Sequence, residues 1–146
     1  MSDFVSQFLS LDFPYMLTLV AALGAFLLGL AWYHPKVLGT KWMLVRGRTG
    51  ADIKPAIMKF VYTFVLWLLA ACFYSFLVIL LRIDNVPGFF CLSSLVWVAF
   101  TMPPTVMGAL YTGHSFEAVA IDMGYQLAGY YVFGLVHVLW PFLNLS

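Results

Sequence analysis

Charged residues are scarce in this chain of 146 residues. Only 9% of the sequence is Asp, Glu, Lys or Arg, against about a quarter in ordinary soluble domains, while 64% of it is hydrophobic. A soluble fold of this composition would have too little polar surface to face water. The composition therefore predicts an integral membrane protein. Because each crossing needs about 20 apolar residues, the chain has room for four transmembrane helices.

Strict alternation of polar and apolar residues, which is typical of a transmembrane β-barrel, is also missing. Long continuous apolar runs are present instead, and they favour helices. The predicted fold class is therefore all-α, an integral membrane four-helix bundle that forms a single transmembrane domain over residues 1–146. The helices are predicted at about residues 13–33, 55–81, 89–111 and 118–140.

Cysteine pairs and the sequence signatures of soluble enzymes are two further absences. The two cysteines, Cys72 and Cys91, lie in apolar runs, where no disulfide framework is expected. The motifs G-x-S-x-G, G-x-G-x-x-G and H-E-x-x-H and the Walker loop do not occur. We therefore predict neither a conventional enzyme nor a cofactor.

The few charges that are present lie mostly in one segment. Six of the seven basic residues lie within or beside the segment between the first two apolar runs, namely Lys36, Lys41, Arg46, Arg48, Lys54 and Lys59. By the positive-inside rule, loop 34–54 is predicted to be cytoplasmic, and four crossings then leave both termini outside. The apolar residues of 37–45 share one face, which predicts a short interfacial helix against the lipid bilayer in this loop.

Two of the predicted helices carry features of packing and bending. Ala21, Ala25 and Gly29 place a small residue at every fourth position, which lets a second helix approach closely, within or between subunits. Pro103 and Pro104 interrupt the third helix and remove two backbone donors. The third helix is therefore predicted to bend there, either as a hinge or as a static kink.

The run at residues 118–140 is the most informative segment, because an apolar helix there holds ionisable residues. Asp122, Gln126 and His137 fall on one line along the helix, together with Gly129 and Phe133. An ionisable group in hydrocarbon is costly, so this face is predicted to point into a bundle or cavity. One interpretation is a polar path from Asp122 to an outer polar group at His137, although the apolar Phe133 interrupts it.

The favoured interpretation is a separate polar site at the cytoplasmic end of the bundle. Its predicted residues are Trp32, Tyr33, His34, His114, Asp122 and Gln126. A competing interpretation makes Asp122 a structural anchor, which lies near a helix start and holds Trp32 or Tyr33 by hydrogen bonding. His34, His114 and Asp122 also offer metal-type ligands, but their spacing fits no close-set pattern, so no metal is predicted.

Two segments resemble a known family. Residues 19–43 contain small residues followed by W-Y-H-P, and residues 120–140 contain I-D-M-G-Y near their start. Most of the resemblance rests on Trp32, Tyr33, Pro35, Gly39, Trp42, Asp122, Gly124 and Tyr125. These patterns resemble the bacterial four-helix membrane family called domain of unknown function 1761, over nearly the whole chain. The resemblance implies a multi-pass protein of the bacterial inner membrane and implies no activity.

Two functions remain open at the level of sequence. The first is a small homo-oligomeric permeation or carrier protein, with the polar site around Asp122. A dimer is favoured, built on the small-residue face of the first helix. The second is a non-catalytic accessory or scaffold subunit that docks a larger membrane protein partner. Neither function involves nucleic acid.

Overall fold

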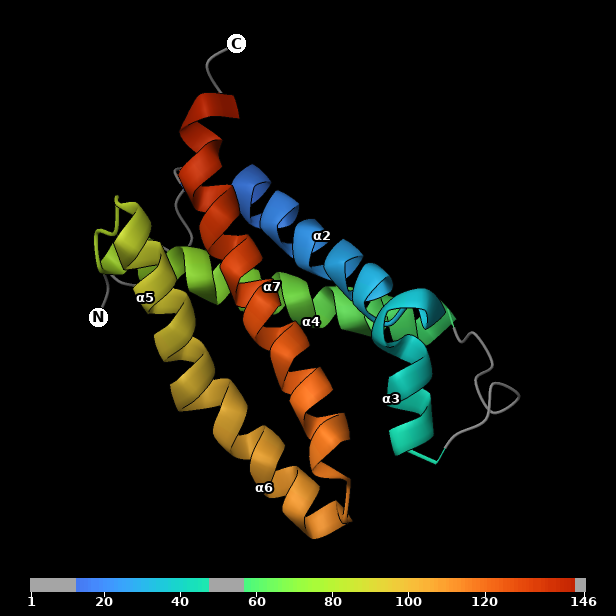
Figure 1. Cartoon of the computed structure of the whole chain (residues 1–146). Coiled ribbons are helices and arrows are strands. Elements are labelled where there is room, and N and C mark those ends of the chain that lie inside the picture. Colours follow the sequence, from blue (N-terminus) through green and yellow to red (C-terminus); the bar gives the residue numbers. More distant parts are fainter. Residues whose placement is uncertain (1–12, 48–56, 144–146) are drawn as a thin grey trace.

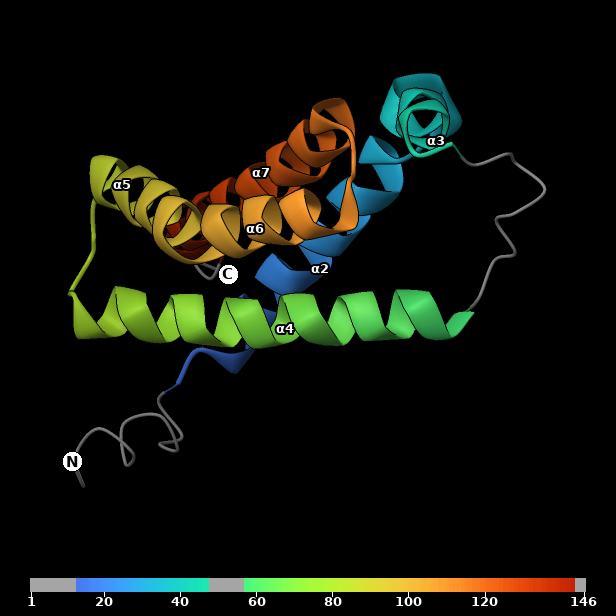
Figure 2. The ribbon, with the colours of Figure 1, turned by 90° about the horizontal axis from the view of Figure 1, so that it is seen from below.

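The computed structural model describes residues 13–47 and 57–143. The elements in chain order are α2 (Tyr15–Trp32), η1 (Pro35–Gly39), α3 (Thr40–Val45), α4 (Ile57–Leu80), α5 (Val86–Val96), η3 (Trp97–Thr101), α6 (Met102–Thr112) and α7 (Phe116–Leu143). All of these elements are helical, and the described residues contain no strand, which confirms the all-α prediction. In Figures 1 and 2, α5, α6 and α7 lie on one side and α4 on the other, and α2 slants across from α4 toward α3, in contact with both α4 and α7.

Three segments of the described chain are long and apolar enough to cross a membrane. They are α2, α4 and the continuous helical stretch Val86–Thr112, which joins α5, η3 and α6. These segments agree with the prediction of a membrane protein. The fourth predicted crossing falls on α7, which has 28 residues but is not among the three apolar segments.

The small-residue stripe of α2 is buried inside the chain. Ala21 and Ala25 are 0% exposed, and α2 contacts both α4 and α7. At Gly29 a Cβ atom would lie 2.4 Å from the Tyr125 hydroxyl oxygen, so only glycine lets α7 approach this closely. The hypothesis that this stripe forms a homodimer is therefore wrong, because the close approach that small residues allow is used within one subunit.

Hydroxyl and indole groups join the helices inside the bundle. The Thr18 hydroxyl on α2 donates to the Ser75 hydroxyl on α4 at 2.9 Å. The indole N–H of Trp67 on α4 donates to the Tyr125 hydroxyl on α7 at 2.5 Å. Such pairs matter in a membrane because the surrounding lipid offers no alternative hydrogen-bond partner.

The two prolines of the third helix follow a widened turn. Directly before Pro103 and Pro104, the helix forms the π-helical turn η3, which closes with a hydrogen bond from the Met102 N–H to the Trp97 carbonyl. A π-helical turn spaces its hydrogen bonds one residue further apart than an α-helix, and such insertions are a known cause of helix bending. The role of this turn as a hinge remains a prediction.

Candidate functional site

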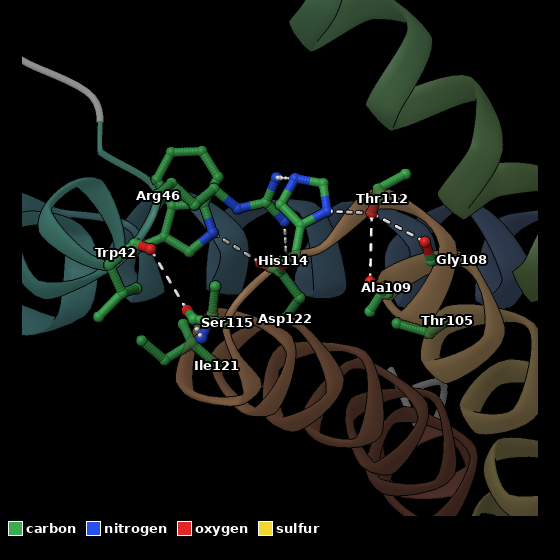
Figure 3. Close-up of polar contacts among 12 residues, drawn as sticks. Trp42, Arg46, Thr105, Gly108, Ala109, Thr112, His114, Ser115, Ile121 and Asp122 are labelled. Atoms are coloured by element: carbon green, nitrogen blue, oxygen red, sulfur yellow. Dashed lines mark hydrogen bonds and ion pairs between the residues drawn. The ribbon is translucent and has the colours of Figure 1, made fainter.

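Both carboxylate oxygens of Asp122, in the second turn of α7, are engaged by other residues (Figure 3). Oδ1 accepts hydrogen bonds from the Tyr33 hydroxyl at 2.7 Å and from the Trp42 indole N–H at 2.8 Å. Oδ2 forms an ion pair with Nη2 of Arg46 at 2.5 Å. We call these four residues the Asp122 cluster. The cluster fastens the end of α2 and the whole of α3 to the start of α7.

The π-helical turn η1 brings the donors of the cluster together. It closes with a hydrogen bond from the Gly39 N–H to the His34 carbonyl at 3.1 Å. Gly39 has no room for a side chain, because a Cβ atom would lie 2.1 Å from the Tyr33 carbonyl oxygen. The turn folds α3 back so that the rings of Tyr33 and Trp42 meet edge to face, with centroids 5.6 Å apart. Both side chains can then reach the same carboxylate oxygen.

The ion pair in the cluster is largely shielded from water, since the side chains of Asp122 and Arg46 are each 21% exposed. The Arg46 guanidinium also lies over the Trp42 ring, 4.8 Å from its centroid, which is a favourable cation–π position. Nε of Arg46 is buried and has no partner among the described residues. Removing either partner would leave a poorly solvated charge, so the pair acts as a latch between α3 and α7.

Tyr33 is a hydrogen-bond donor in this cluster and not a base. Burial raises the pKa of the Tyr33 phenol far above its ordinary value, and the hydrogen bond to Asp122 and the charge of that carboxylate raise it further. Tyr33 directly follows the apolar helix α2. Its phenol therefore stays protonated at physiological pH. Its proton remains available to the carboxylate, so Tyr33 serves to position Asp122.

Trp32 and His114, two of the residues predicted for the polar site, border the Asp122 cluster without touching its carboxylate. The Trp32 indole N–H donates to the Ile121 carbonyl at 3.2 Å. Nε2 of His114 lies 3.4 Å from Nη1 of Arg46, and its Nδ1 contacts the Thr112 hydroxyl. Because Arg46 can only donate, this contact requires His114 to accept through Nε2.

His34 and Gln126, also predicted for the polar site, form no side-chain hydrogen bond with the Asp122 carboxylate. Nδ1 of His34 accepts a hydrogen bond from the Lys36 backbone N–H at 3.2 Å and caps η1. Gln126 meets α6 instead, where its Oε1 accepts from the Thr105 hydroxyl at 3.4 Å.

Sequence reasoning left Trp42 and Arg46 out of the site. Trp42 counted only toward the interfacial helix and the family pattern, and Arg46 only as one of the basic residues in the predicted cytoplasmic loop. One signal pointed to Arg46: a carboxylate within an apolar helix needs a cationic partner, and an arginine fork suits a carboxylate better than a lysine does.

The polar path toward His137 is closed by aromatic packing. Phe133 is 0% exposed, and its ring centroid lies 5.5 Å from that of Trp67. Trp67 also fills the space over Gly129, where a Cβ atom would lie 2.3 Å from the indole ring. His137 is buried separately, with Nδ1 2.7 Å from the Phe133 carbonyl oxygen. The less favoured interpretation, a continuous polar path from Asp122 to His137, is therefore wrong.

A cavity of about 740 Å³ adjoins the Asp122 cluster. Tyr33 and Trp42 line it, together with residues from the last turns of α2, from η1 and α3, and from the first turns of α4. Its largest apolar side chains are Phe26, Leu30, Met43 and Phe60. The volume falls within the range of roughly 300–1,000 Å³ found for small-molecule sites. The cluster thus holds in place one wall of a largely apolar cavity.

The described residues offer no cluster suited to metal binding. They contain no group of three or more His, Cys, Asp or Glu side chains placed to hold a metal ion. Cys72 and Cys91 are both free thiols. With both oxygens of Asp122 engaged, the arrangement is suited to fastening helices and shaping the cavity.

The fold and the site define an all-helical protein with three apolar segments of membrane-spanning length, in which one carboxylate latches a short helix beside an apolar cavity. The chain belongs to the family described as "Protein of unknown function (DUF1761)", whose model matches residues 16–138. The match spans every residue of the Asp122 cluster and confirms the family resemblance. No curated protein and no solved structure matches the chain.

Proposed function

We propose that this protein is a small non-catalytic membrane carrier that holds an amphipathic molecule in the cavity beside the Asp122 cluster. The observation that carries the proposal is the cavity of about 740 Å³, one wall of which is tied to Asp122 through Tyr33 and Trp42. Phe26 on α2 and Phe60 on α4 supply apolar surface, while His34 lies at the end nearest the loop. A molecule with a polar end and an apolar end matches this lining.

We further propose that the chain crosses the bacterial inner membrane four times, with loop 34–54 cytoplasmic and both termini outside. The fourth crossing is α7, whose 28 residues extend about 42 Å at 1.5 Å per residue, more than a bilayer core of about 30 Å. Two of its ionisable groups face protein, since Asp122 lies in the cluster and the buried His137 ring packs against the rings of Tyr74 and Phe89. Ionisable groups that face a bundle cost less to insert than groups that face lipid.

Fusions of topology reporters test this arrangement. With four crossings, alkaline phosphatase fused after Ser146 is expected to be active and green fluorescent protein fused there to be dark, because both would be exported. Fusions after Gly47, in the predicted cytoplasmic loop, should give the opposite pair of signals. A fluorescent C-terminal fusion combined with a fluorescent fusion at Gly47 would contradict the fourth crossing.

The carrier proposal is tested with lipid movement between leaflets. In proteoliposomes that contain NBD-labelled phosphatidylglycerol, the native protein is expected to carry probe from the inner leaflet to external dithionite, which bleaches it. Leu30 lines the cavity, so Leu30→Trp should fill the space and return bleaching to the level of protein-free vesicles. Leu27→Trp, at a residue 52% exposed and outside the lining, should leave the rate unchanged. The proposal would be overturned if both variants lost the same part of the bleaching rate, or if the native protein did not raise that rate above the level of protein-free vesicles.

A second candidate function, the accessory or scaffold subunit, is favoured by the closed interior. Trp67 and Phe133 fill the middle of the bundle, and α6 has no buried residue, so its side chains remain available to a partner. In this case Asp122→Asn would leave the leaflet assay unchanged and would dissociate a larger complex. A homo-oligomer would also need a surface other than the α2 stripe, and α6 offers Leu110 and Tyr111, which are 76% and 92% exposed.

A further inference from the structure

We propose that the occupant of the cavity is a membrane phospholipid with a net negative headgroup, whose acyl chain lies along α2 and whose headgroup lies among Lys36, Lys41 and Lys59. The inference rests on the carrier proposal and names the ligand of the same site. It commits to a lipid because the lining is largely apolar and three of the lining residues are each next in sequence to a lysine.

One lysine comes from each segment that builds the loop end of the cavity. In η1, Lys36 follows the lining residue Pro35; in α3, Lys41 precedes the lining residue Trp42. In α4, Lys59 precedes the lining residue Phe60. All three lysines are exposed, and none forms an ion pair with a residue in the described part of the chain.

No carboxylate on these segments competes for the three lysines. Residues 13–47 and 57–81 contain neither Asp nor Glu. From α7, Asp122 is already paired with Arg46, and Glu117 forms no ion pair with a described residue. Within the described ranges the charge of these lysines is therefore unbalanced, which suits an anionic headgroup. Basic pockets between transmembrane helices on the cytoplasmic side bind anionic lipid headgroups in this way.

The apolar part of the cavity lies where an acyl chain would reach it. Phe26 and Leu30 belong to the last turns of α2, and Phe60 to the first turn of α4, both of which are segments of membrane-spanning length. The cavity thus extends from the bilayer core to the level at which α2 ends. There, Nδ1 of His34 is occupied by the Lys36 N–H, so the neutral ring carries its proton on Nε2 and can donate to a headgroup oxygen. A soluble phosphate would leave the apolar portion unfilled.

Native mass spectrometry of the detergent-purified chain tests the proposal, with dioleoyl phosphatidylglycerol and dioleoyl phosphatidylcholine as probes. The native protein is expected to retain phosphatidylglycerol in preference to phosphatidylcholine. The double variant Lys36→Gln, Lys59→Gln should weaken phosphatidylglycerol binding by about fivefold for each lysine removed and leave phosphatidylcholine binding unchanged. The double variant Lys36→Arg, Lys59→Arg keeps the charge and should keep the preference.

The cavity variants assign the bound lipid to this site. Leu30→Trp should lower retention of both lipids, and Leu27→Trp should lower neither. Equal retention of the two lipids by the native protein would overturn the anionic-lipid assignment while leaving the carrier proposal intact. If glycerol phosphate alone displaced phosphatidylglycerol, the lysines would bind a soluble phosphate, and the anionic-lipid assignment would again be overturned. If the native protein retained phosphatidylglycerol but did not move lipid between leaflets, the carrier proposal would be wrong and the lipid-binding site would still be supported.

Discussion

Replacing Asp122 with alanine is expected to release α3 from α7 and to lower the free energy of unfolding by about 2–4 kcal/mol. The substitution removes the partner of a mostly shielded arginine and leaves the Tyr33 and Trp42 donors unsatisfied. Breaking a buried ion pair costs roughly 3–5 kcal/mol, and the 21% exposure of both side chains reduces that figure. Thermal unfolding in detergent should show a midpoint lower by about 5–10 °C.

Asp84→Ala provides the matched control for this substitution. Asp84 lies exposed in the turn between α4 and α5, where it accepts a hydrogen bond of 3.1 Å from the side-chain amide of Asn85. Surface substitutions of this kind usually change stability by less than about 0.5 kcal/mol. The paired variant Asp122→Leu, Arg46→Leu should lose less than the sum of its single variants, because no unpaired charge remains. Equal stability of the Asp122 and Asp84 variants would refute the latch.

The helices could be predicted from long apolar runs, but one helix start was misplaced. The prediction began the third helix at about residue 89, whereas α5 starts at Val86. Pro87 lies in the first turn, where its missing N–H is no loss, and the Asn85 side chain accepts from the Gly88 N–H at 2.8 Å. Proline and glycine can therefore begin a helix as well as interrupt one.

The Asp122 cluster was only half predictable. The anchor interpretation proposed hydrogen bonding from Trp32 or Tyr33, and the Tyr33 bond is present at 2.7 Å. The contributions of Trp42 and Arg46 depend on η1, a π-helical turn that folds α3 back toward α7. Hydrophobic periodicity contains no signal for such a turn, because it depends on contacts between Gly39 and the backbone of Tyr33.

The polar face of α7 points into protein as expected, but what fills its middle could not be predicted. Spacing alone placed Asp122, Gln126 and His137 in line and could not show what fills the intervals. Gly129 leaves a gap in that line, and the Trp67 ring from α4 occupies it. A glycine in a membrane helix often accommodates a bulky neighbour, yet the identity of that neighbour depends on the tertiary arrangement.

Gly129→Ala is therefore expected to destabilise the protein by about 1–3 kcal/mol, the usual cost of overpacking a filled core. The new Cβ atom would lie 2.3 Å from the Trp67 ring, much closer than a van der Waals contact. The indole cannot easily move away, because it is 8% exposed and its ring centroid lies 5.4 Å from that of Tyr125 and 5.5 Å from that of Phe133. The midpoint of thermal unfolding in detergent measures the effect.

Gly108→Ala is the opposite case, since a Cβ atom on that α6 residue would meet nothing within 4 Å. Alanine costs less backbone entropy than glycine in a helix, so this variant should gain roughly 0.5–1 kcal/mol. In the Gly129→Ala background, Trp67→Phe removes the ring atoms nearest the new Cβ and should recover part of the loss. If the two glycine variants unfold at the same temperature, Trp67 does not fill the gap at Gly129, and the argument against a polar path through α7 fails with it.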